Sequence, residues 1–393
     1  MSGPLQSLRI LDFSTLLPGP FASLMLADLG ADVLRIESPT RPDLVRVLPP
    51  YVRGVSVVHA HLNRNKRSLA VDLKQPAGHE IMVALLKQYD VVIEQFRPGV
   101  MARLGLSYED LREHCPGLIY VSITGYGQTG PYRDRAGHDL NYLALSGILS
   151  YNGRKATGPQ PMAVQVADVA GGSAHAVIAL LAAIVHRQQT GEGQYIDISM
   201  TDAAFSLQAL TAPAALAEGS NPALEGDTLN GGSFYDCYAC ADGLYLSVAG
   251  LEPQFFAAFV QVLGRPDLAG MAVVREPGQV AWLKAEIAQE LAKLPRQDWL
   301  NQFANLDTCT EPVLSFQEAC QHPVLQERGM LVDVPDRQGG SLKQVASPLR
   351  FSRTPVTYRY AGGAVGEDSD QVLKELGIAA AIIEHWRRDG VIG

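Results

Sequence analysis

The stretch LRILDFSTLLPGPFASLMLADLGADVLRIE, residues 8–37, is the strongest indication of how this chain folds. Residues 8–13 form an apolar run typical of a buried strand, residues 18–29 place apolar side chains at helical spacing, and residues 32–36 return to a strand pattern. The same order of strand, helix and strand recurs between residues 68 and 94. This alternation predicts an α/β fold, in which helices cover a parallel sheet.

A glycine-rich loop follows the next apolar run, residues 118–124. Its sequence Gly125-Tyr-Gly-Gln-Thr-Gly130 matches the G-x-G-x-x-G pattern of dinucleotide-binding folds. That pattern requires a helix at the third glycine, whereas Pro131 and charged residues follow here without apolar periodicity. We therefore expect no nicotinamide cofactor, and we expect ligands at the carboxyl ends of the strands.

A change in composition divides the chain. Residues 218–233, EGSNPALEGDTLNGGS, are rich in the residues typical of a connecting segment, and a smaller α+β pattern follows them. The sequence predicts a large domain at residues 1–199, a linker at 200–228, a small domain at 229–330, and a C-terminal segment, 331–393, that returns to the large domain.

Composition argues against several classes of partner. The 393 residues carry 32 Lys and Arg against 41 Asp and Glu, a formal charge of −9, which is the wrong sign for binding nucleic acid or an anionic membrane. The longest apolar stretch, residues 174–185, is shorter than the roughly 20 residues that a bilayer requires, and we expect it to be a buried helix. The start of the chain lacks the features of a secretion signal, and the five cysteines form no paired metal motif. We therefore expect a cytoplasmic protein with no metal and no cofactor.

Basic side chains gather in the first hundred residues, against the acidic balance of the whole chain. The run Asn63-Arg-Asn-Lys-Arg67 precedes Asp72-Leu73-Lys74, and Arg41 and Arg46 lie nearby in the sequence. Such a cluster suits a phosphate-bearing ligand, but a salt-bridged surface would give the same pattern. Arg97 directly follows a predicted strand, and this position favours ligand binding.

Three titratable residues have the chemistry of an active site. His138 lies in a polar cluster that continues to Tyr142, Asp168 immediately precedes a predicted helix rich in Ala and Gly, and Glu252 precedes another helix. Each has a structural alternative, because a histidine or an acid before a helix can simply cap it or face its dipole. An imidazole and a carboxylate facing one cleft would instead suit acid–base or nucleophilic chemistry.

Several segments resemble those of a known family. They are GYGQTGP, AGHDLNYLALSGILS, ADVAGG, TGEGQYIDISM, ADGLYLSVAGLEPQFF and DTCTEPVLSF. They are similar to segments of the α-methylacyl-CoA racemases, within the family III CoA-transferase superfamily, and the resemblance runs from about residue 5 to about residue 350. It implies an interlocked homodimer, in which each chain has a Rossmann-like large domain and a small domain. The active sites would lie between the large domain of one chain and the small domain of the other.

The resemblance also implies roles for individual residues. His138 and Asp168 would be two catalytic bases, and Glu252 would orient His138, so that the α-carbon of a 2-methylacyl-CoA is inverted through an enolate. Backbone N–H groups of the helix at Asp168 are expected to stabilise that enolate. Coenzyme A, as part of the substrate, would be held by Arg41, Arg46, Lys66, Arg67, Asp72, Leu73, Lys74, Arg97, Asp139 and Tyr142. One departure is the stretch at residues 40–63, which is longer than in typical racemases and closer in length to the transferases.

Two other functions compete with the racemase. In the transferases of the superfamily, the aspartate that matches Asp168 is a nucleophile, which forms an anhydride and then an aspartyl-CoA thioester. Those enzymes shield the intermediates with a glycine-rich loop, of which only Gly231-Gly232 appears here, and they lack His138 and Glu252 as a pair. An acyl-CoA-binding protein without turnover would keep the basic cluster but would not explain the three titratable residues. We therefore favour the racemase.

Overall fold

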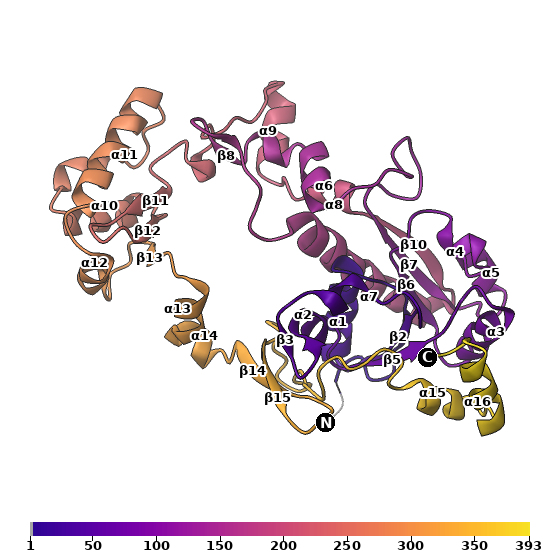
Figure 1. The fold of residues 1–393 in the computed structure, drawn as a ribbon. Coiled ribbons are helices and arrows are strands. Elements are labelled where there is room, and N and C mark those ends of the chain that lie inside the picture. The colour runs from indigo at the N-terminus through magenta and orange to yellow at the C-terminus, as the bar shows by residue number, and fades with distance from the viewer. Residues whose placement is uncertain (1–2) are drawn as a thin grey trace. The chain divides into compact units, whose positions relative to one another are not determined.

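A six-stranded parallel sheet forms the centre of the first of two units in the computed structural model, which describes residues 3–393 (Figure 1). In spatial order the strands are β10 (Gln194–Ser199), β7 (Ile119–Thr124), β6 (Val91–Glu94), β1 (Arg9–Asp12), β2 (Asp32–Glu37) and β5 (Lys66–Ala70). After β1 the chain adds β2 and then β5 on one side of β1. It then crosses to the other side of β1 and adds β6, β7 and β10 there. The predicted parallel α/β sheet is confirmed, and its order reverses between β1 and β6, where such sheets bind ligands.

Helices pack against the strands of this sheet. One hydrophobic cluster joins Leu11 and Leu34 of the central strands to α3 (Pro76–Leu85), α15 (Ser369–Glu375) and α16 (Ala380–Arg388). Two further helices, α1 (Pro18–Asp28) and the long helix that ends at Thr190, also pack against the sheet. Strands β6 and β7 are buried along their whole length, which explains their nearly continuous apolar sequences.

The helix that carries Asp168 runs from Ala167 to Thr190 and changes geometry along its length. Residues Ala167–Ala174 are π-helical, and α7 (His175–Thr190) continues as an ordinary α-helix. At 24 residues it is apolar and long enough to cross a membrane, by length and composition alone, and about a third of its most apolar window is buried. The prediction of a buried helix was wrong: the small residues of α7 pack inward, but Ile178 is 63% exposed and Val185 is 54% exposed.

Residues 40–63 fold as part of the first unit. They contain the 3₁₀ turn Leu44–Val47, the hairpin of β3 (Tyr51–Val52) and β4 (Val55–Ser56), and the helix α2 (Val57–Leu62). Asp43 and Ser56 cap the turn and α2, because their side chains accept backbone N–H groups. Helix α2 also packs near α1, and this places its apolar side chains beside the start of α1.

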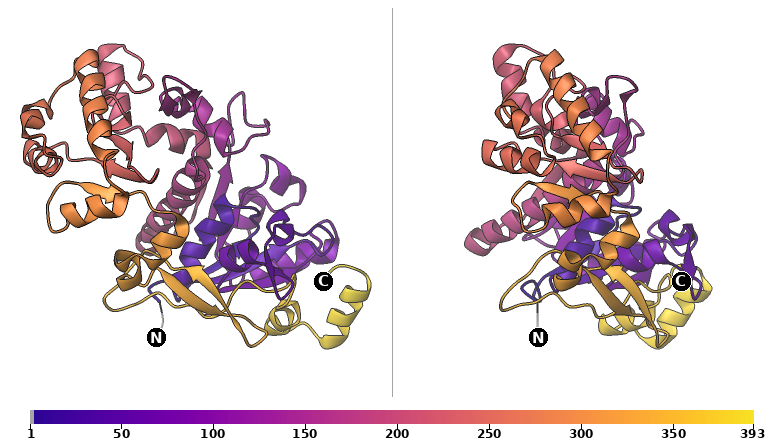
Figure 2. Two further views of the ribbon diagram at one scale, coloured as in Figure 1. Left: turned by 60° about the vertical axis from the view of Figure 1, so that its left-hand side comes forward. Right: turned by 90° about the vertical axis from the view of Figure 1, so that its left-hand side faces the viewer.

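The C-terminal residues Pro323–Gly393 belong to the first unit. Their hairpin, β14 (Leu331–Pro335) and β15 (Ser341–Val345), packs Val334 against Ala60 of α2. Figures 1 and 2 show this segment, coloured orange to yellow, alongside the indigo N-terminal elements. The remaining short helices of this unit are α4 (Val100–Arg103), α5 (Tyr108–Arg112), α6 (Asp139–Leu145), α8 (Met200–Ser206) and α14 (Pro323–Glu327).

The second unit comprises Gly147–Met162 and Gln208–His322. Its antiparallel sheet of β11 (Asp236–Ala239), β12 (Tyr245–Val248) and β13 (Thr310–Pro312) encloses an aromatic core with three helices. They are α10 (Pro253–Val262), α11 (Pro277–Leu291) and α12 (Arg296–Phe303), while α9 (Thr211–Glu218) and α13 (Phe316–Gln321) flank them in the sequence. The sequence analysis placed residues 147–162 in the large domain, whereas they belong to the second unit. They form the hairpin of β8 (Gly153–Arg154) and β9 (Gly158–Pro159). An ion pair between Arg154 and Asp236, 2.5 Å long, ties this hairpin to the second unit.

Candidate active site

A hydrogen bond links the loop of His138 to the helix of Asp168. His138 immediately precedes α6 and has an exposed side chain, and its backbone N–H donates to Asn141 Oδ1 at 3.0 Å. Asp139, the first residue of α6, accepts the backbone N–H of Asp168 at 3.0 Å through its Oδ1. The structure therefore brings His138, Asp139 and Asp168 to one region of the first unit, although they lie about thirty residues apart in the sequence.

The position of Asp168 depends on close packing of glycines. It lies in the first turn of the π-helical segment rather than before it, so the N-cap interpretation was wrong: Val166 holds that position. A Cβ atom on Gly172 would approach Met200 of α8 to 3.0 Å, and Gly171 also faces α8. Ser173 Oγ donates to Pro18 O at 2.6 Å and anchors the segment to α1. π-Helical segments are frequent at functional sites, and this one places the backbone N–H of Asp168 beside Asp139 of α6.

The carboxyl group of Asp168 has an unusual protonation equilibrium. Burial raises its pKa to about 7, and the negative charge of Asp139 adds to the shift. Within residues 3–393, no Lys, Arg or His forms an ion pair with it. Such a carboxyl group holds and releases a proton with comparable ease near neutral pH, which suits acid–base chemistry.

Two backbone donors beside Asp168 are already engaged. The N–H of Asp168 binds Asp139, and the N–H of Val169 donates to Gln165 O at 2.9 Å. The N–H groups of Asp168 and Val169 are therefore not available to stabilise an enolate, although we predicted enolate donors among the N–H groups of this helix. The reason is that the helix begins earlier than the sequence pattern indicated.

The side chain of Tyr142 packs against the start of the glycine-rich loop. Its hydroxyl donates to Gly137 O at 2.6 Å, and burial, reinforced by Asp168, raises its pKa well above the usual value, while Arg97 opposes the shift. A Cβ atom on Gly125 would lie 2.4 Å from the tyrosine ring, and one on Gly137 would lie 2.7 Å from it. Gly125 and Gly137 therefore make room for the Tyr142 ring, whereas Gly127 and Gly130 of the loop adopt positive φ angles of 81° and 85°.

A buried carboxyl that the sequence analysis missed lies at the end of β6. Glu94 accepts the N–H of Phe96 at 2.7 Å, and burial raises its pKa to about 7. It faces a pocket of about 310 Å³ that Arg97, Tyr108 and Tyr195 also line. The sequence signal was available, since VVIE ends an apolar strand with a carboxylate at the edge where ligands bind.

The predicted basic residues fall into two groups. Lys66 is only 1% exposed, and its Nζ contacts Pro20 O at 2.9 Å and Asn63 Oδ1 at 3.1 Å. Arg67 pairs with Asp32 at 2.9 Å and with Glu375 at 2.8 Å, so protein carboxylates already bind its guanidinium. Arg46 likewise pairs with Glu37 at 2.5 Å.

The other group remains at the surface. Arg41, Lys74 and Arg97 are exposed, so their charges can reach an anionic ligand. Asp72 accepts the N–H of Lys74 at 3.1 Å and shapes the loop after β5, while Leu73 packs on the core cluster. Their predicted roles in holding coenzyme A stay predictions.

Glu252 belongs to the second unit, where it precedes α10 and is followed by Pro253 at the first helical position. Its side chain is exposed and makes no capping bond to α10. Its predicted influence on His138 stays a prediction.

Comparisons with known proteins identify the relatives of this chain. The model of CoA-transferase family III matches residues 5–369. An alpha-methylacyl-CoA racemase of Homo sapiens is 34% identical and aligns with 99% of this chain and 97% of its own length. A succinate–glutarate CoA-transferase of Agrobacterium fabrum is also 34% identical, over 95% of this chain and 96% of its own. The crystal structure of a CAIB/BAIF family protein from Brucella suis superposes with a TM-score of 0.84 at 30% identity, covering 96% of this chain and all of that one.

Proposed function

Because the chain belongs to CoA-transferase family III, we propose that it is an isomerase that inverts the α-carbon of 2-methylacyl-CoA thioesters. His138 and Asp168 act as the two bases, on opposite faces of that carbon. Both racemases and transferases occur among relatives of equal identity, so the choice between the reactions rests on the chemistry of the site.

The reaction needs two proton transfers. One base removes the α-proton, and the electrons of the broken C–H bond move into the thioester to form an enolate. The conjugate acid of the other base then delivers a proton to the opposite face and forms the new C–H bond. Each turnover leaves the proton on the other side chain, and exchange with water restores the starting state.

The pKa of Asp168 is the observation that supports this reaction most. General acid–base catalysis works best with a pKa near the operating pH, and burial together with Asp139 raises that of Asp168 to about 7. A nucleophilic carboxylate must instead be ionised and gains nothing from a nearby negative charge. The absence of an ion-pairing cation at Asp168 among the described residues therefore favours the racemase over the transferase.

The substrate's coenzyme A is the proposed ligand of the exposed cations. Arg97 follows β6 at the ligand-binding edge of the sheet, and Arg41 follows β2. Lys66, Arg67 and Arg46 contribute indirectly, since their ion pairs hold β5 and the segment after β2 in place.

A homodimer completes the proposed site. Helices α7 and α8 expose Ile178, Val185 and Phe205, which is unusual for helices beside a core sheet and suits burial against a second copy. In the arrangement that the family resemblance implies, Glu252 of the partner subunit orients His138. Light scattering on the purified protein should give twice the mass of the 42.3 kDa chain.

A CoA-transferase is the second candidate, because several relatives carry that name and because the family resemblance suggests that the stretch at residues 40–63 is closer in length to that of the transferases. Incubation with acyl-CoA in heavy water separates the two reactions. The racemase places deuterium at the α-carbon of a 2-methylacyl-CoA without any acceptor, as NMR would detect. The transferase converts a free carboxylate to its CoA ester, and hydroxylamine traps its acylated Asp168; this result without α-deuterium would refute the racemase.

A further inference from the structure

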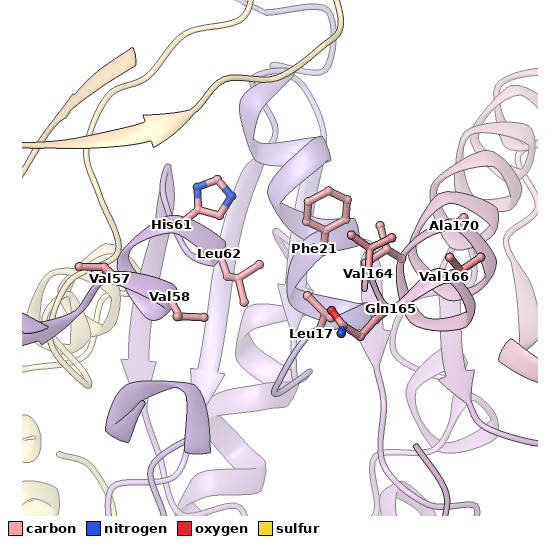
Figure 3. A pocket seen from close by; sticks show the side chains of 11 residues that line it. Leu17, Phe21, Val57, Val58, His61, Leu62, Val164, Gln165, Val166 and Ala170 are labelled. Atoms are coloured by element: carbon pink, nitrogen blue, oxygen red, sulfur yellow. The ribbon is translucent and has the colours of Figure 1, made fainter. Parts of the chain in front are cut away.

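Two pockets of the first unit differ in chemistry. The larger, of about 540 Å³, is apolar, and Leu17, Phe21 and Val58 are among the side chains that line it (Figure 3). The smaller, of about 310 Å³, is the pocket at the end of β6 that Glu94 and Tyr195 line, and we call it the Glu94 pocket. A carboxyl group in the wall of a cavity is a polar anchor for a ligand, and the proposed reaction does not use this one.

We propose that the Glu94 pocket binds a small molecule that carries an ammonium group on a short carbon chain, with the ammonium group donating to the Glu94 carboxylate. The ligand is distinct from the acyl-CoA substrate, and the inference does not rest on the proposed function. Among the described residues, the lining of this pocket includes neither His138 nor Asp168.

Glu94 is a buried carboxyl group without a cation. Only 4% of the residue is exposed, and it accepts hydrogen bonds from the N–H of Phe96, at 2.7 Å, and from the side chain of Ser122. No Lys, Arg or His between residues 3 and 393 forms an ion pair with it. A carboxylate removed from water is costly unless a cation compensates it. An ammonium ligand supplies that charge together with three N–H donors.

Aromatic side chains form a wall of the Glu94 pocket. The ring centroid of Tyr195 lies 5.7 Å from that of Tyr108 and 5.7 Å from that of Tyr120, and all three residues line the pocket. The Tyr195 hydroxyl donates to Ser122 Oγ at 3.0 Å, which holds this ring in place. Aromatic rings attract ammonium groups within about 6 Å of their centroids, and their carbon atoms pack against methylene groups. The wall therefore suits both the charged and the apolar part of the proposed ligand.

Other classes of ligand fit the Glu94 pocket less well. A divalent metal ion needs several oxygen or nitrogen ligands, and the described part of the chain has no group of three or more His, Cys, Asp or Glu that could hold one. An anion would meet two carboxyl groups, those of Glu94 and the exposed Glu109, against the single cation Arg97 in the described lining. The volume lies at the lower end of the range for ligand pockets, which favours a small molecule.

The probe for a binding experiment is n-butylammonium, with n-butanol and butyrate as a neutral and an anionic probe of equal chain length. The Met101 side chain lines the pocket, so in protein labelled with ¹³C at the methionine methyl groups its NMR signal, assigned by its loss in Met101→Leu, reports on the pocket. At pH 8, n-butylammonium should bind at least about tenfold more tightly than either control probe. The apolar pocket of Figure 3 has no charged lining to distinguish the three probes. Equal affinities for the three probes at Met101 would overturn the proposal.

Substitutions locate the ammonium group at Glu94. Glu94→Gln keeps the shape of the side chain but removes its charge, so the affinity for n-butylammonium should fall at least about tenfold. Glu109→Gln is the matched control, because it removes an exposed carboxylate from the same lining, and it should change the affinity by less than about twofold. Ala102→Leu fills the pocket from an exposed position of α4, leaves the buried carboxyl group unchanged, and should abolish binding. Binding that survives both Glu94→Gln and Ala102→Leu, or an equal loss in Glu94→Gln and Glu109→Gln, would refute the site.

The pH dependence of binding gives a further test. Burial, assisted by the negative charge of Asp197, raises the pKa of Glu94 to about 7, so the carboxylate that attracts the cation is lost as the pH falls. The affinity for n-butylammonium, which stays charged as a lysine side chain does, should therefore fall at least about tenfold from pH 8 to pH 5.5. The other charged or titratable groups around Glu94 are Arg97, Tyr108, Glu109, Tyr120, Tyr195 and Asp197. Glu94→Gln should abolish the pH dependence, and a dependence that persists in this variant would assign the cation to one of those groups and contradict the proposal.

Discussion

Glu37 is buried and Asp168 is half-buried in the same unit, yet their pKa values move in opposite directions. Burial favours the protonated form of each. At Glu37 the charges of Arg35 and Arg46, with hydrogen bonds from Arg46 and Ser68, outweigh burial and hold the pKa at about 2. At Asp168 no cation opposes burial, and Asp139 adds a negative charge, so the pKa rises to about 7. Burial alone therefore does not set the direction of a carboxyl group's pKa shift, which also depends on the charges around it.

The largest expected effect concerns the activity of Asp168. Replacement by Asn keeps the shape of the side chain but removes its proton transfer, so racemisation should fall by about 10³-fold. Optical rotation of a resolved 2-methylacyl-CoA measures the loss. Unchanged substrate binding in calorimetry would show that the site is intact, and retention of more than a tenth of the activity would exclude Asp168 as a base.

Glu37 should respond through stability instead. In Glu37→Gln, Arg35 and Arg46 lose the carboxylate that neutralises them in a buried setting, and the free energy of unfolding should fall by about 3 kcal/mol at pH 7. Urea denaturation measures this change. A loss below about 1 kcal/mol would mean that Asp43 alone compensates Arg35.

The matched substitution at Asp168 should have the opposite sign. A carboxyl group with a raised pKa binds its proton more tightly in the folded protein, so its ionisation costs stability as the pH rises from about 4 through 7. Asp168→Asn should therefore raise the free energy of unfolding by about 1–3 kcal/mol at pH 8 and much less at pH 4. For Glu37 the lowered pKa means that its stabilisation is present above about pH 4.5 and is lost as the pH falls toward 2. An equal effect of Asp168→Asn at both pH values would contradict the raised pKa.

The smallest effect tests the neighbour of Asp168. Asp139→Asn removes one charge but keeps the Oδ1 atom that accepts the Asp168 N–H. The pKa of Asp168 should then fall. For the substrate configuration from which Asp168 removes the proton, the pH at which kcat/KM reaches half its plateau should therefore move below about 7. Asp139→Ala is the control that also removes the hydrogen bond. An unchanged pH profile in Asp139→Asn would leave burial as the sole cause of the shift.

The sequence predicted the elements of the site better than their electrostatics. Local periodicity was enough for the parallel sheet, because strands such as β6 and β7 are buried along their whole length. The ion pair of Lys66 could not be predicted, since its partner Asp12 lies 54 residues away on another strand. The same holds for Asp168: its pKa depends on burial and on Asp139, 29 residues away, and the π-helical turn that carries it depends on packing of glycines against α8. Tertiary contacts of this kind leave no periodic signal in the sequence.

The most direct test of the two-base reaction is the initial rate of α-deuterium exchange, measured separately from the 2R and 2S forms of one acyl-CoA. Asp168→Asn and His138→Gln should each abolish inversion, and each should keep part of the exchange from one configuration, with the two variants keeping opposite configurations. Equal loss of exchange from both configurations in both variants would contradict two bases acting on opposite faces of the α-carbon.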